Sequence, residues 1–366
     1  MSLLIIGGMH MEKHYFAANN TSVGFYNYFN NIISPEEAER IYILKGGPGV
    51  GKSSFMKKFA KFLSELETPV EYIHCSTDYN SLDGIFVPEY KWLMVDGTSP
   101  HVVEPKFPGL VDEILDFAQY LDKEELKQHA NEIKKVNKEK SRFYQSAYRY
   151  LEMAAIILNE INQIYDDLTD DNKKRLEVKK LISDLDELLV EKKETKNLKE
   201  HTKGKLRRLF SEAYTASGYI SYINKLCKDK IVWEINSPNH DYIADLLDKI
   251  VNYVSLLDYD VEAYYMAIFP KKLQHIYIKE LNLMIISFGT SSDKEEFKSR
   301  QSEIDELNKL YDLILEKAIN SFKIAKEKHE LLEKIYIKSM NFDKVDLLYK
   351  EIIFKLKKEI KTHKEE

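Results

Sequence analysis

Residues 46–53 combine glycines, a lysine and a serine at the spacing of a phosphate-binding loop. The stretch reads GGPGVGKS and satisfies the pattern G-x-x-x-x-G-K-[ST]. Glycines here let the backbone curl, so that successive N–H groups point at phosphate oxygens. Lys52 is expected to reach the β- and γ-phosphates of ATP or GTP, and Ser53 to place its hydroxyl on Mg²⁺. The residues predicted to contact the nucleotide are Gly46, Gly47, Pro48, Gly49, Val50, Gly51, Lys52, Ser53 and Ser54.

A second group is needed to hold Mg²⁺, and WLMVD at 92–96 supplies four apolar residues followed by Asp96. This is the expected form of an acid at the end of a buried strand, so Asp96 is predicted to share the metal with Ser53. The alternative is a turn-capping aspartate, because Asp-Gly is also a turn dipeptide.

The residue after Asp96 is glycine, so the glutamate that often serves as hydrolytic base is missing. Another carboxylate must then orient the attacking water, and Asp78 and Asp83 in CSTDYNSLDG are the candidates. Lys52, Asp96 and Asp78 are therefore predicted as catalytic. His101, just beyond Asp96, is the remaining loop residue near the expected γ-phosphate, although loop histidines more often have no catalytic role.

Three elements must position these groups. Residues 41–44 are predicted to form a strand that ends at the loop, and residues 52–63 a helix whose positive dipole end faces the anion. Asp78 and Asp83 follow a predicted strand at 70–74, so both are expected on the phosphate side of the sheet.

The chain also contains an internal repeat. Residues 13–28 align with 207–222, and 81–98 align with 272–289. KEEL at 123 corresponds to KEEF at 294, each followed by charged helical sequence. The repeat predicts two copies of one plan, a small α/β lobe followed by helices. Thr21 and Thr215 occupy aligned positions before aromatic segments and are predicted to cap helices.

Glycine and proline are absent from 110–203 and from 290–366, which are rich in Lys, Glu, Leu and Ile. Each stretch is predicted to form a long antiparallel helical hairpin, with bends at 167–172 and 339–344. The predicted boundaries are a lobe at 1–122, a hairpin at 123–200, a second lobe at 201–292 and a second hairpin at 293–366. Residues 1–10 have no counterpart in the second copy and are expected to be a disordered extension.

The second copy has lost the chemistry of the loop. Its stretch INSPNHDY at 235–242 replaces the glycines with Asn236, Ser237, Asn239 and Asp241, and Lys52 with Tyr242. A tight N–H cradle would be strained without glycine, and Asp241 would repel phosphate. We therefore predict one nucleotide site. KGKLRR at 203–208 could supply an arginine finger, but a solvated linker face is the favoured interpretation.

Composition restricts the remaining possibilities. The net charge is −6 and there are two cysteines, Cys75 and Cys227, without metal-type spacing. Together with the lack of a long apolar run, this predicts a cytoplasmic protein without a membrane partner. Nucleic acid is an unlikely partner, because the balance of charge is acidic and no basic–aromatic motif is evident.

Residues 41–96 resemble the P-loop NTPase superfamily. The phrases HYFAANNTSVGF, CSTDYNSLDG and VDGTSPHVVEPKFPG are similar to a family of tandem P-loop ATP-binding proteins from low-GC, often spore-forming bacteria. The resemblance implies ATP or GTP with Mg²⁺ but identifies no substrate. Some members keep both loops intact, so the departure at 236–243 puts hydrolysis at two sites in doubt.

These observations predict an α/β protein of two tandem P-loop NTPase-like lobes, the second degenerate, each followed by a long helical hairpin. The expected function is Mg²⁺-dependent ATP hydrolysis, with the helices carrying the nucleotide state to a protein partner. Two alternatives stay open. One is a kinase that transfers the γ-phosphoryl group to a small-molecule or nucleotide acceptor, and the other is a non-catalytic nucleotide sensor.

Overall fold

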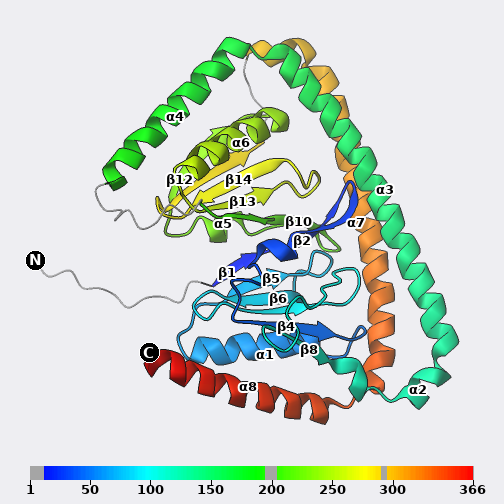
Figure 1. The fold of residues 1–366 in the computed structure, drawn as a ribbon. Helices are drawn as coiled ribbons and strands as arrows, with labels where there is room; N and C mark the ends of the chain where they lie inside the picture. Colours follow the sequence, from blue (N-terminus) through cyan, green and yellow to red (C-terminus); the bar gives the residue numbers. More distant parts are fainter. Residues whose placement is uncertain (1–11, 194–203, 290–294, 366) are drawn as a thin grey trace, which may run out of the picture. The chain divides into compact units, whose positions relative to one another are not determined.

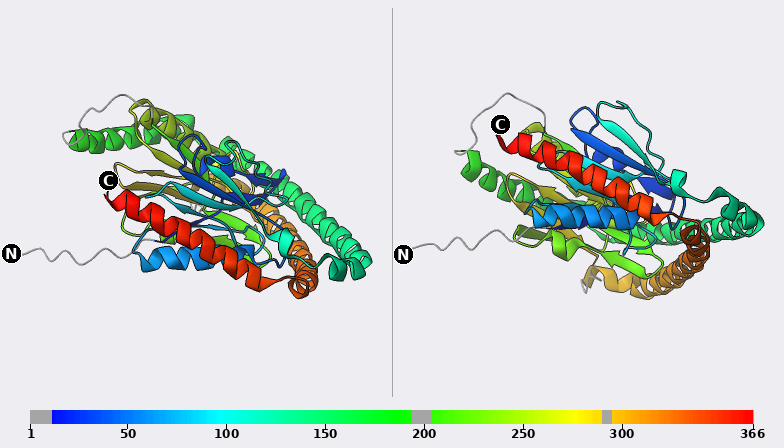
Figure 2. Two further views of the ribbon diagram at one scale, coloured as in Figure 1. Left: turned by 60° about the horizontal axis from the view of Figure 1, so that its bottom comes forward. Right: turned by 90° about the horizontal axis from the view of Figure 1, so that it is seen from below.

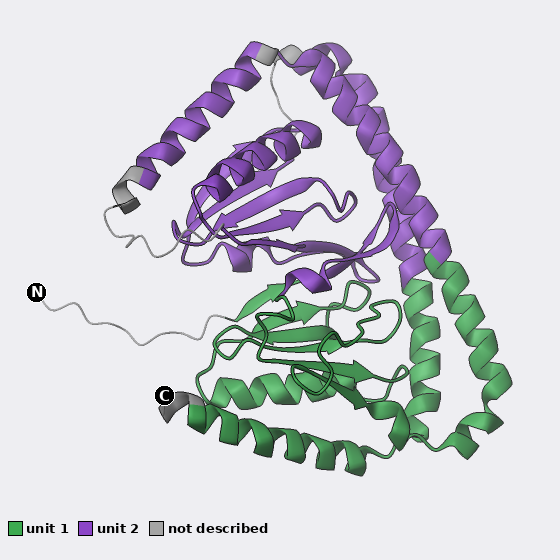
Figure 3. Ribbon diagram, in the orientation of Figure 1, with its two compact units in different colours: residues 1–15, 33–144, 323–366 green, residues 16–32, 145–322 purple. Residues whose placement is uncertain are grey.

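The computed structural model describes residues 12–193, 204–289 and 295–365 of a mixed α/β chain (Figure 1). The predicted extension at 1–10 and Lys203 lie outside these residues. Two compact units divide the chain (Figure 3). Unit 1 consists of residues 1–15, 33–144 and 323–366, and unit 2 of residues 16–32 and 145–322. Among the described residues, no helix is long and apolar enough to cross a membrane.

Unit 1 contains a six-stranded sheet in the order β1-β5-β6-β7-β4-β8. β4 pairs in parallel with both β7 and β8, and β1 in parallel with β5, whereas β6 runs antiparallel to its two neighbours. The strands are β1 (Lys13–Tyr15), β4 (Arg40–Lys45), β5 (Glu71–His74), β6 (Leu82–Val87), β7 (Trp92–Asp96) and β8 (Asp112–Asp116).

Two helices cover one face of this sheet, α1 (Lys52–Glu65) and α8 (Phe342–Glu365), and they lie side by side in Figures 1 and 2. Phe55 and Phe59 of α1 share a buried cluster with Ile352 and Leu356 of α8 and with inward-facing strand residues. The i, i+4 spacing of these apolar residues gives each helix one buried stripe. The predicted strand–loop–helix unit at 41–63 is therefore present.

Unit 2 contains a five-stranded sheet in the order β12-β15-β14-β13-β9. Read from β9, its order and strand directions repeat those of β1-β5-β6-β7-β4, and within the described ranges only β8 has no counterpart. The strands are β9 (Leu206–Leu209), β12 (Ile231–Asn236), β13 (Val261–Tyr265), β14 (Leu273–Ile278) and β15 (Leu283–Phe288), with α6 (His240–Leu256) after β12 and the short α5 (Ile223–Leu226) before it. The repeat detected in the sequence is visible in this shared topology.

Each repeat also has a small antiparallel hairpin, and both hairpins belong to unit 2. Thr21 ends a strand and donates from its hydroxyl to the Gly24 carbonyl at 2.7 Å, and Thr215 does the same to Gly218 at 2.9 Å. The prediction that these threonines cap helices is wrong, because their side chains close β-turns instead. The hairpins are β2 (Ala18–Thr21) with β3 (Gly24–Asn27), and β10 (Glu212–Thr215) with β11 (Gly218–Ser221).

The long helices break where the sequence predicts. α3 (Ala130–Leu168) is followed after two residues by α4 (Asp171–Lys193), and α7 (Gln301–Lys338) is followed by α8. The two helices of each pair diverge (Figure 1) instead of forming the expected hairpin. α4 packs on α6, where Tyr242 donates to Glu177 at 2.8 Å, and α8 packs on the first sheet, where Arg40 donates to Glu359 at 2.5 Å.

The units and the predicted segments thus divide the chain differently, because α3 and α7 each contribute to both units. The segment before α2 (Lys123–Gln128) also differs from the helical prediction for 110–203. It forms the edge strand β8, which pairs with β4, and a short 3₁₀ helix, η2 (Phe117–Tyr120). Buried Leu115 and Phe117 make this segment part of the sheet core.

Candidate functional site

The glycine-rich loop of residues 46–51 connects β4 to α1 at the carboxyl end of the sheet. Gly49 and Gly51 have φ angles of +71° and +94°, which side chains other than glycine rarely adopt. α1 begins after Gly51 without a side-chain cap. Its first N–H groups and its positive dipole end therefore face the loop, as an anion site requires.

Lys52 folds back over this loop. Its Nζ donates to the carbonyls of Gly46 at 2.8 Å and Gly47 at 2.9 Å, and lies 3.6 Å from Oδ2 of Asp96. Asp96 reaches the loop because β7 pairs in parallel with β4, with Asp96 opposite Leu44. The structure therefore brings together the two residues that the sequence identified most strongly.

Thr98 ties the loop to Asp96 and was missed by the sequence analysis. Its hydroxyl donates to the Gly46 carbonyl at 3.0 Å, and its N–H donates to Oδ1 of Asp96 at 2.8 Å. The second repeat, which lacks the loop glycines, has Gly289 at the aligned position. A comparison of the two copies could therefore have identified Thr98 as a residue specific to the first loop.

Ser53 lies in the first turn of α1, where its hydroxyl oxygen accepts from the N–H of Leu82 at 3.0 Å. This bond holds the hydroxyl at the carboxyl-end edge of the sheet, on the side where Asp96 lies. Ser54, one residue further along, lines a pocket between α1 and α8.

A second carboxylate, Asp83, stands across from Asp96. β6 and β7 pair antiparallel with Gly84 opposite Val95, and extending this register places Asp83 opposite Asp96 on the same face of the sheet. Asp83 is only 4% exposed, and its Oδ2 has no hydrogen bond but lies 3.5 Å from Nε2 of His101. Burial raises the pKa of Asp83, the nearby imidazole of His101 opposes that shift, and the charge of Asp96 adds to it.

Cys75, which also lies beside Asp83, is not set up as a nucleophile. Burial and then the charge of Asp83 raise the pKa of its thiol well above the ordinary value. Because the thiolate is the reactive form, this environment disfavours a nucleophilic role for Cys75.

Helix α7 covers the outer side of the loop within unit 1. A β-carbon placed on Gly49 would lie 2.8 Å from the carbonyl oxygen of Glu333, and one on Gly47 would lie 2.7 Å from the ring of Tyr336. Lys326 of the same helix donates to Asp78 at 3.2 Å. Asp78, predicted to orient water, is thus held in an ion pair with α7.

Two side chains of α7, His329 and Glu333, have pKa values shifted by burial and by nearby charges. Burial, followed by Lys140 and Lys52, lowers the pKa of His329 to about 4. Burial, followed by Asp78 and Glu330, raises the pKa of Glu333. Both shifts favour the neutral forms of these two side chains over the loop.

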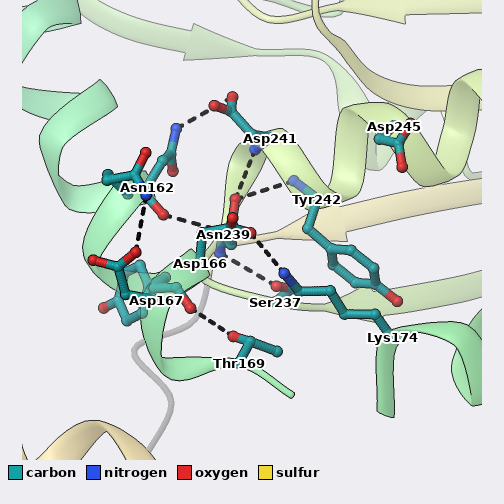
Figure 4. Close-up of polar contacts among 12 residues, drawn as sticks. Asn162, Asp166, Asp167, Thr169, Lys174, Ser237, Asn239, Asp241, Tyr242 and Asp245 are labelled. Carbon is teal, nitrogen blue, oxygen red and sulfur yellow. Dashed lines mark hydrogen bonds and ion pairs between the residues drawn. The ribbon is translucent and has the colours of Figure 1, made fainter. Parts of the chain in front are cut away.

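The equivalent loop of the second repeat is closed by its own side chain (Figure 4). Oδ1 of Asn239 accepts from the N–H groups of Asp241 and Tyr242, both at 3.0 Å. Nδ2 of Asn239 points to α3, at 3.4 Å from the Asn162 carbonyl and 3.4 Å from Oδ1 of Asp166. The amides that would hold an anion are occupied by this cap, so the loss of chemistry predicted from sequence has a structural counterpart.

The acids are also absent from the second sheet. Positions aligned with Asp83 and Asp96 are Gln274 and Ser287, and the Ser287 hydroxyl donates to the Gln274 carbonyl at 2.9 Å. The small cavity next to the capped loop has a volume of about 30 Å³, room for a water molecule but not for a phosphate chain.

Arg207, from the KGKLRR run considered as a source of an arginine finger, is paired within its own sheet. Arg207 donates to Glu262, which is 2% exposed, at 3.0 Å. Lys13 makes the aligned pair with Glu71 in unit 1 at 3.4 Å. Arg207 therefore lies on strand β9 as part of the repeated sheet edge, with its side chain only 13% exposed, so the favoured interpretation of a solvated linker face is wrong at this position.

The residues present fit a magnesium ion that is shared with phosphate. In the described residues no cluster of three or more His, Cys, Asp or Glu side chains is arranged to hold a metal alone. Mg²⁺ usually takes one or two carboxylates and completes its shell with water and substrate phosphate oxygens. Asp96 and Ser53 meet that requirement, and the oxygen of Asp83 that lacks a hydrogen bond is left to accept from a water molecule bound to the ion.

No protein-family model, curated protein or solved structure matches the chain.

Proposed function

We propose that the chain is a Mg²⁺-dependent ATPase of the P-loop type, with a single nucleotide site at residues 46–54. The observation that carries this proposal is the placement of Lys52 over the loop carbonyls, 3.6 Å from Asp96, at the start of a helix without a side-chain cap. A phosphate chain in the loop would accept from the free end of α1 and replace the carbonyls as the partner of the Lys52 ammonium.

Each residue then has a defined task. Lys52 holds the β- and γ-phosphates, and Ser53 and Asp96 hold Mg²⁺, which when bound neutralises charge on the phosphate oxygens. Asp83 is better suited than Asp78 to accept a proton from the attacking water. Burial raises its pKa towards the range of an effective base, whereas Asp78 is paired with Lys326.

A kinase is the second candidate, and one observation favours it. The residue after Asp96 is Gly97, so the glutamate that often activates water in hydrolytic members of this superfamily is missing. A kinase would release ADP only when an acceptor hydroxyl is present, whereas an ATPase would show turnover alone or with a protein partner.

A nucleotide sensor is the third candidate, favoured by the packing of α7 directly on the loop. Filling the loop would shift that packing without any need for chemistry. A sensor would bind ATP tightly and release no phosphate under any condition.

The first test is thermal unfolding of the purified chain with ATP, ADP, GTP and AMP, each with Mg²⁺ and with EDTA. We expect ATP or GTP with Mg²⁺ to raise the melting temperature by several degrees, since saturation at a hundred times the Kd adds about 2.7 kcal/mol. Lys52→Ala should remove the shift, while Lys173→Ala, beside the second loop, should leave it intact. If no triphosphate shifts the wild-type melting curve, the site is not a nucleotide site.

Phosphate release and acceptor-dependent ADP formation then separate the three candidates. Asp96→Asn should retain part of the ATP affinity but lose most of its dependence on Mg²⁺, because the ion keeps one protein ligand instead of two. Equal loss of affinity with and without Mg²⁺ would contradict a metal role for Asp96.

A further inference from the structure

A pocket of about 260 Å³ opens between α1 and α8 in unit 1. α1 contributes residues spaced along one helical face, and the first turn of α8 forms the opposite wall. The lining residues used below are Gly51, Ser54, Phe55, Lys58, Phe342 and Asp346. Its size is close to the lower end of the range of about 300–1,000 Å³ found for small-molecule sites.

The pocket adjoins the proposed phosphate site, because the two share residues. Gly51 ends the glycine-rich loop and Ser54 lies in the first turn of α1, and both also line the pocket. The ring of Phe342 lies over Gly51, at 3.3 Å from the position that a β-carbon there would take. A molecule whose phosphates occupy the loop therefore has this pocket beside it for its other end.

The walls of the pocket suit a flat aromatic ring with a polar edge. Phe342 is 40% exposed although it is a large aromatic residue, so part of its side chain is not covered by the rest of the protein. At the rim, Nζ of Lys58 donates to Oδ1 of Asp346 at 2.7 Å. An ammonium and a carboxylate together offer a donor and an acceptor, which match the ring nitrogens, carbonyl and amino groups of a purine.

We infer that this pocket receives the purine base of the bound nucleotide, with the base stacked on Phe342 and its polar edge bound by Lys58 and Asp346. The inference rests on the proposed function, because the phosphates in the loop bring the base to this place. A purine offers a larger ring surface for stacking than a pyrimidine, so ATP and GTP should bind more tightly than CTP and UTP.

The test compares ATP with inorganic tripolyphosphate, which carries the phosphates without a base. Isothermal titration with Mg²⁺ is performed on the wild type, Phe342→Ala and the matched control Phe354→Ala, which removes a 62% exposed phenylalanine from the same helix. We expect Phe342→Ala to weaken ATP roughly 5- to 150-fold, the range of base–aromatic stacking, and to leave tripolyphosphate unchanged. Phe354→Ala should change neither.

The outcomes separate this inference from the proposed function. If Phe342→Ala binds ATP as the wild type does, or loses ATP and tripolyphosphate equally, the base does not occupy this pocket although the phosphate site stands. If the wild type binds neither ligand, both ideas fail. Asp346→Asn provides a second variant with the helix intact, and it should change the ratio of ATP to GTP affinity; an unchanged ratio would exclude the rim from base recognition.

Discussion

Replacement of Asn239 by alanine should destabilise unit 2 and leave nucleotide binding in unit 1 untouched. Asn239 is 2% exposed, and its side chain accepts from two amides of α6 at 3.0 Å and approaches two acceptors on α3 at 3.4 Å. Alanine at this position leaves the first turn of α6 without its cap and breaks the polar contact with α3.

The magnitude follows from these contacts. Loss of an N-cap costs about 0.5–2 kcal/mol. The two contacts with α3 are long, and one of them reaches a carboxylate that Lys174 also binds, so together they add no more than about 1 kcal/mol. The expected loss is about 0.5–3 kcal/mol, which for a unit of this size lowers the melting temperature by about 1–12 °C.

The assay is thermal unfolding followed by circular dichroism, together with ATP titration in the presence of Mg²⁺. Asn236→Ala is the control, because Asn236 is an exposed asparagine of the same loop region. Unchanged stability of Asn239→Ala would refute the capping argument. A parallel loss of ATP affinity at equal folded fraction would show that the second loop takes part in nucleotide binding, and the single-site proposal would be wrong.

Three further changes probe the site in unit 1. Asp83→Asn should stabilise the chain without nucleotide at neutral pH, because it removes a carboxylate whose charged form is disfavoured by burial. Because burial raises the pKa of Asp83, the wild type loses stability as the pH rises from about 3.8 through the folded pKa. The stability gained by Asp83→Asn should therefore vanish at about pH 3.5 in urea titrations. A gain that does not depend on pH would contradict the reasoning. His329 has a pKa lowered to about 4, so its contribution to stability is present above pH 6.5 and is lost as the pH falls towards 4. The melting temperature of His329→Gln should therefore fall less than that of the wild type between about pH 7.5 and 5. Equal decreases would exclude His329 as a source of the pH dependence. Gly49→Ala should cost more than Gly109→Ala in chemical denaturation, because both glycines have positive φ near +70° but only Gly49 has a backbone carbonyl at 2.8 Å from the added carbon; equal costs would mean that α7 is not packed on the loop.

The local parts of the site could be predicted from sequence because each depends on neighbouring residues. β-branched residues before the loop, glycines within it and an amphipathic stretch after it determine a strand, a curled loop and a helix without reference to the rest of the chain. Asp96 was found by the same logic, since an acid that follows an apolar run lies at the end of a strand.

The partners from distant parts of the chain could not be predicted in this way. Helical periodicity gives a helix an apolar face, but it does not tell which surface that face will cover. α8 and the end of α7 were therefore assigned to a hairpin of their own, whereas Ile352 and Leu356 complete the core of the first sheet. Tyr336 and Glu333 are unremarkable in the sequence, and only their contact with Gly47 and Gly49 identifies them as part of the site.

The two loops share one contact with a helix, although only the first has the residues that the proposed phosphate site requires. Aligning KEEL at 123 with KEEF at 294 makes Asn162 of α3 equivalent to Glu333 of α7. In unit 2 the Asn162 carbonyl lies 3.4 Å from the side chain of Asn239, and in unit 1 the Glu333 carbonyl faces Gly49, which has no side chain. A helix carbonyl therefore lies next to the same aligned position of each loop.

The two repeats differ in whether a side chain lies between the helix and the loop. In the second repeat a buried asparagine fills that space and bonds to both sides, so the contact is fixed. In the first repeat the backbone of α7 meets the bare backbone of a loop whose hydrogen bonds would change, under the proposed function, when a phosphate replaced the Gly46 and Gly47 carbonyls as partners of Lys52. Under the proposed function, the contact that is fixed in one copy would respond to nucleotide in the other, and α7 would be the route by which the state of the loop reaches the rest of that helix.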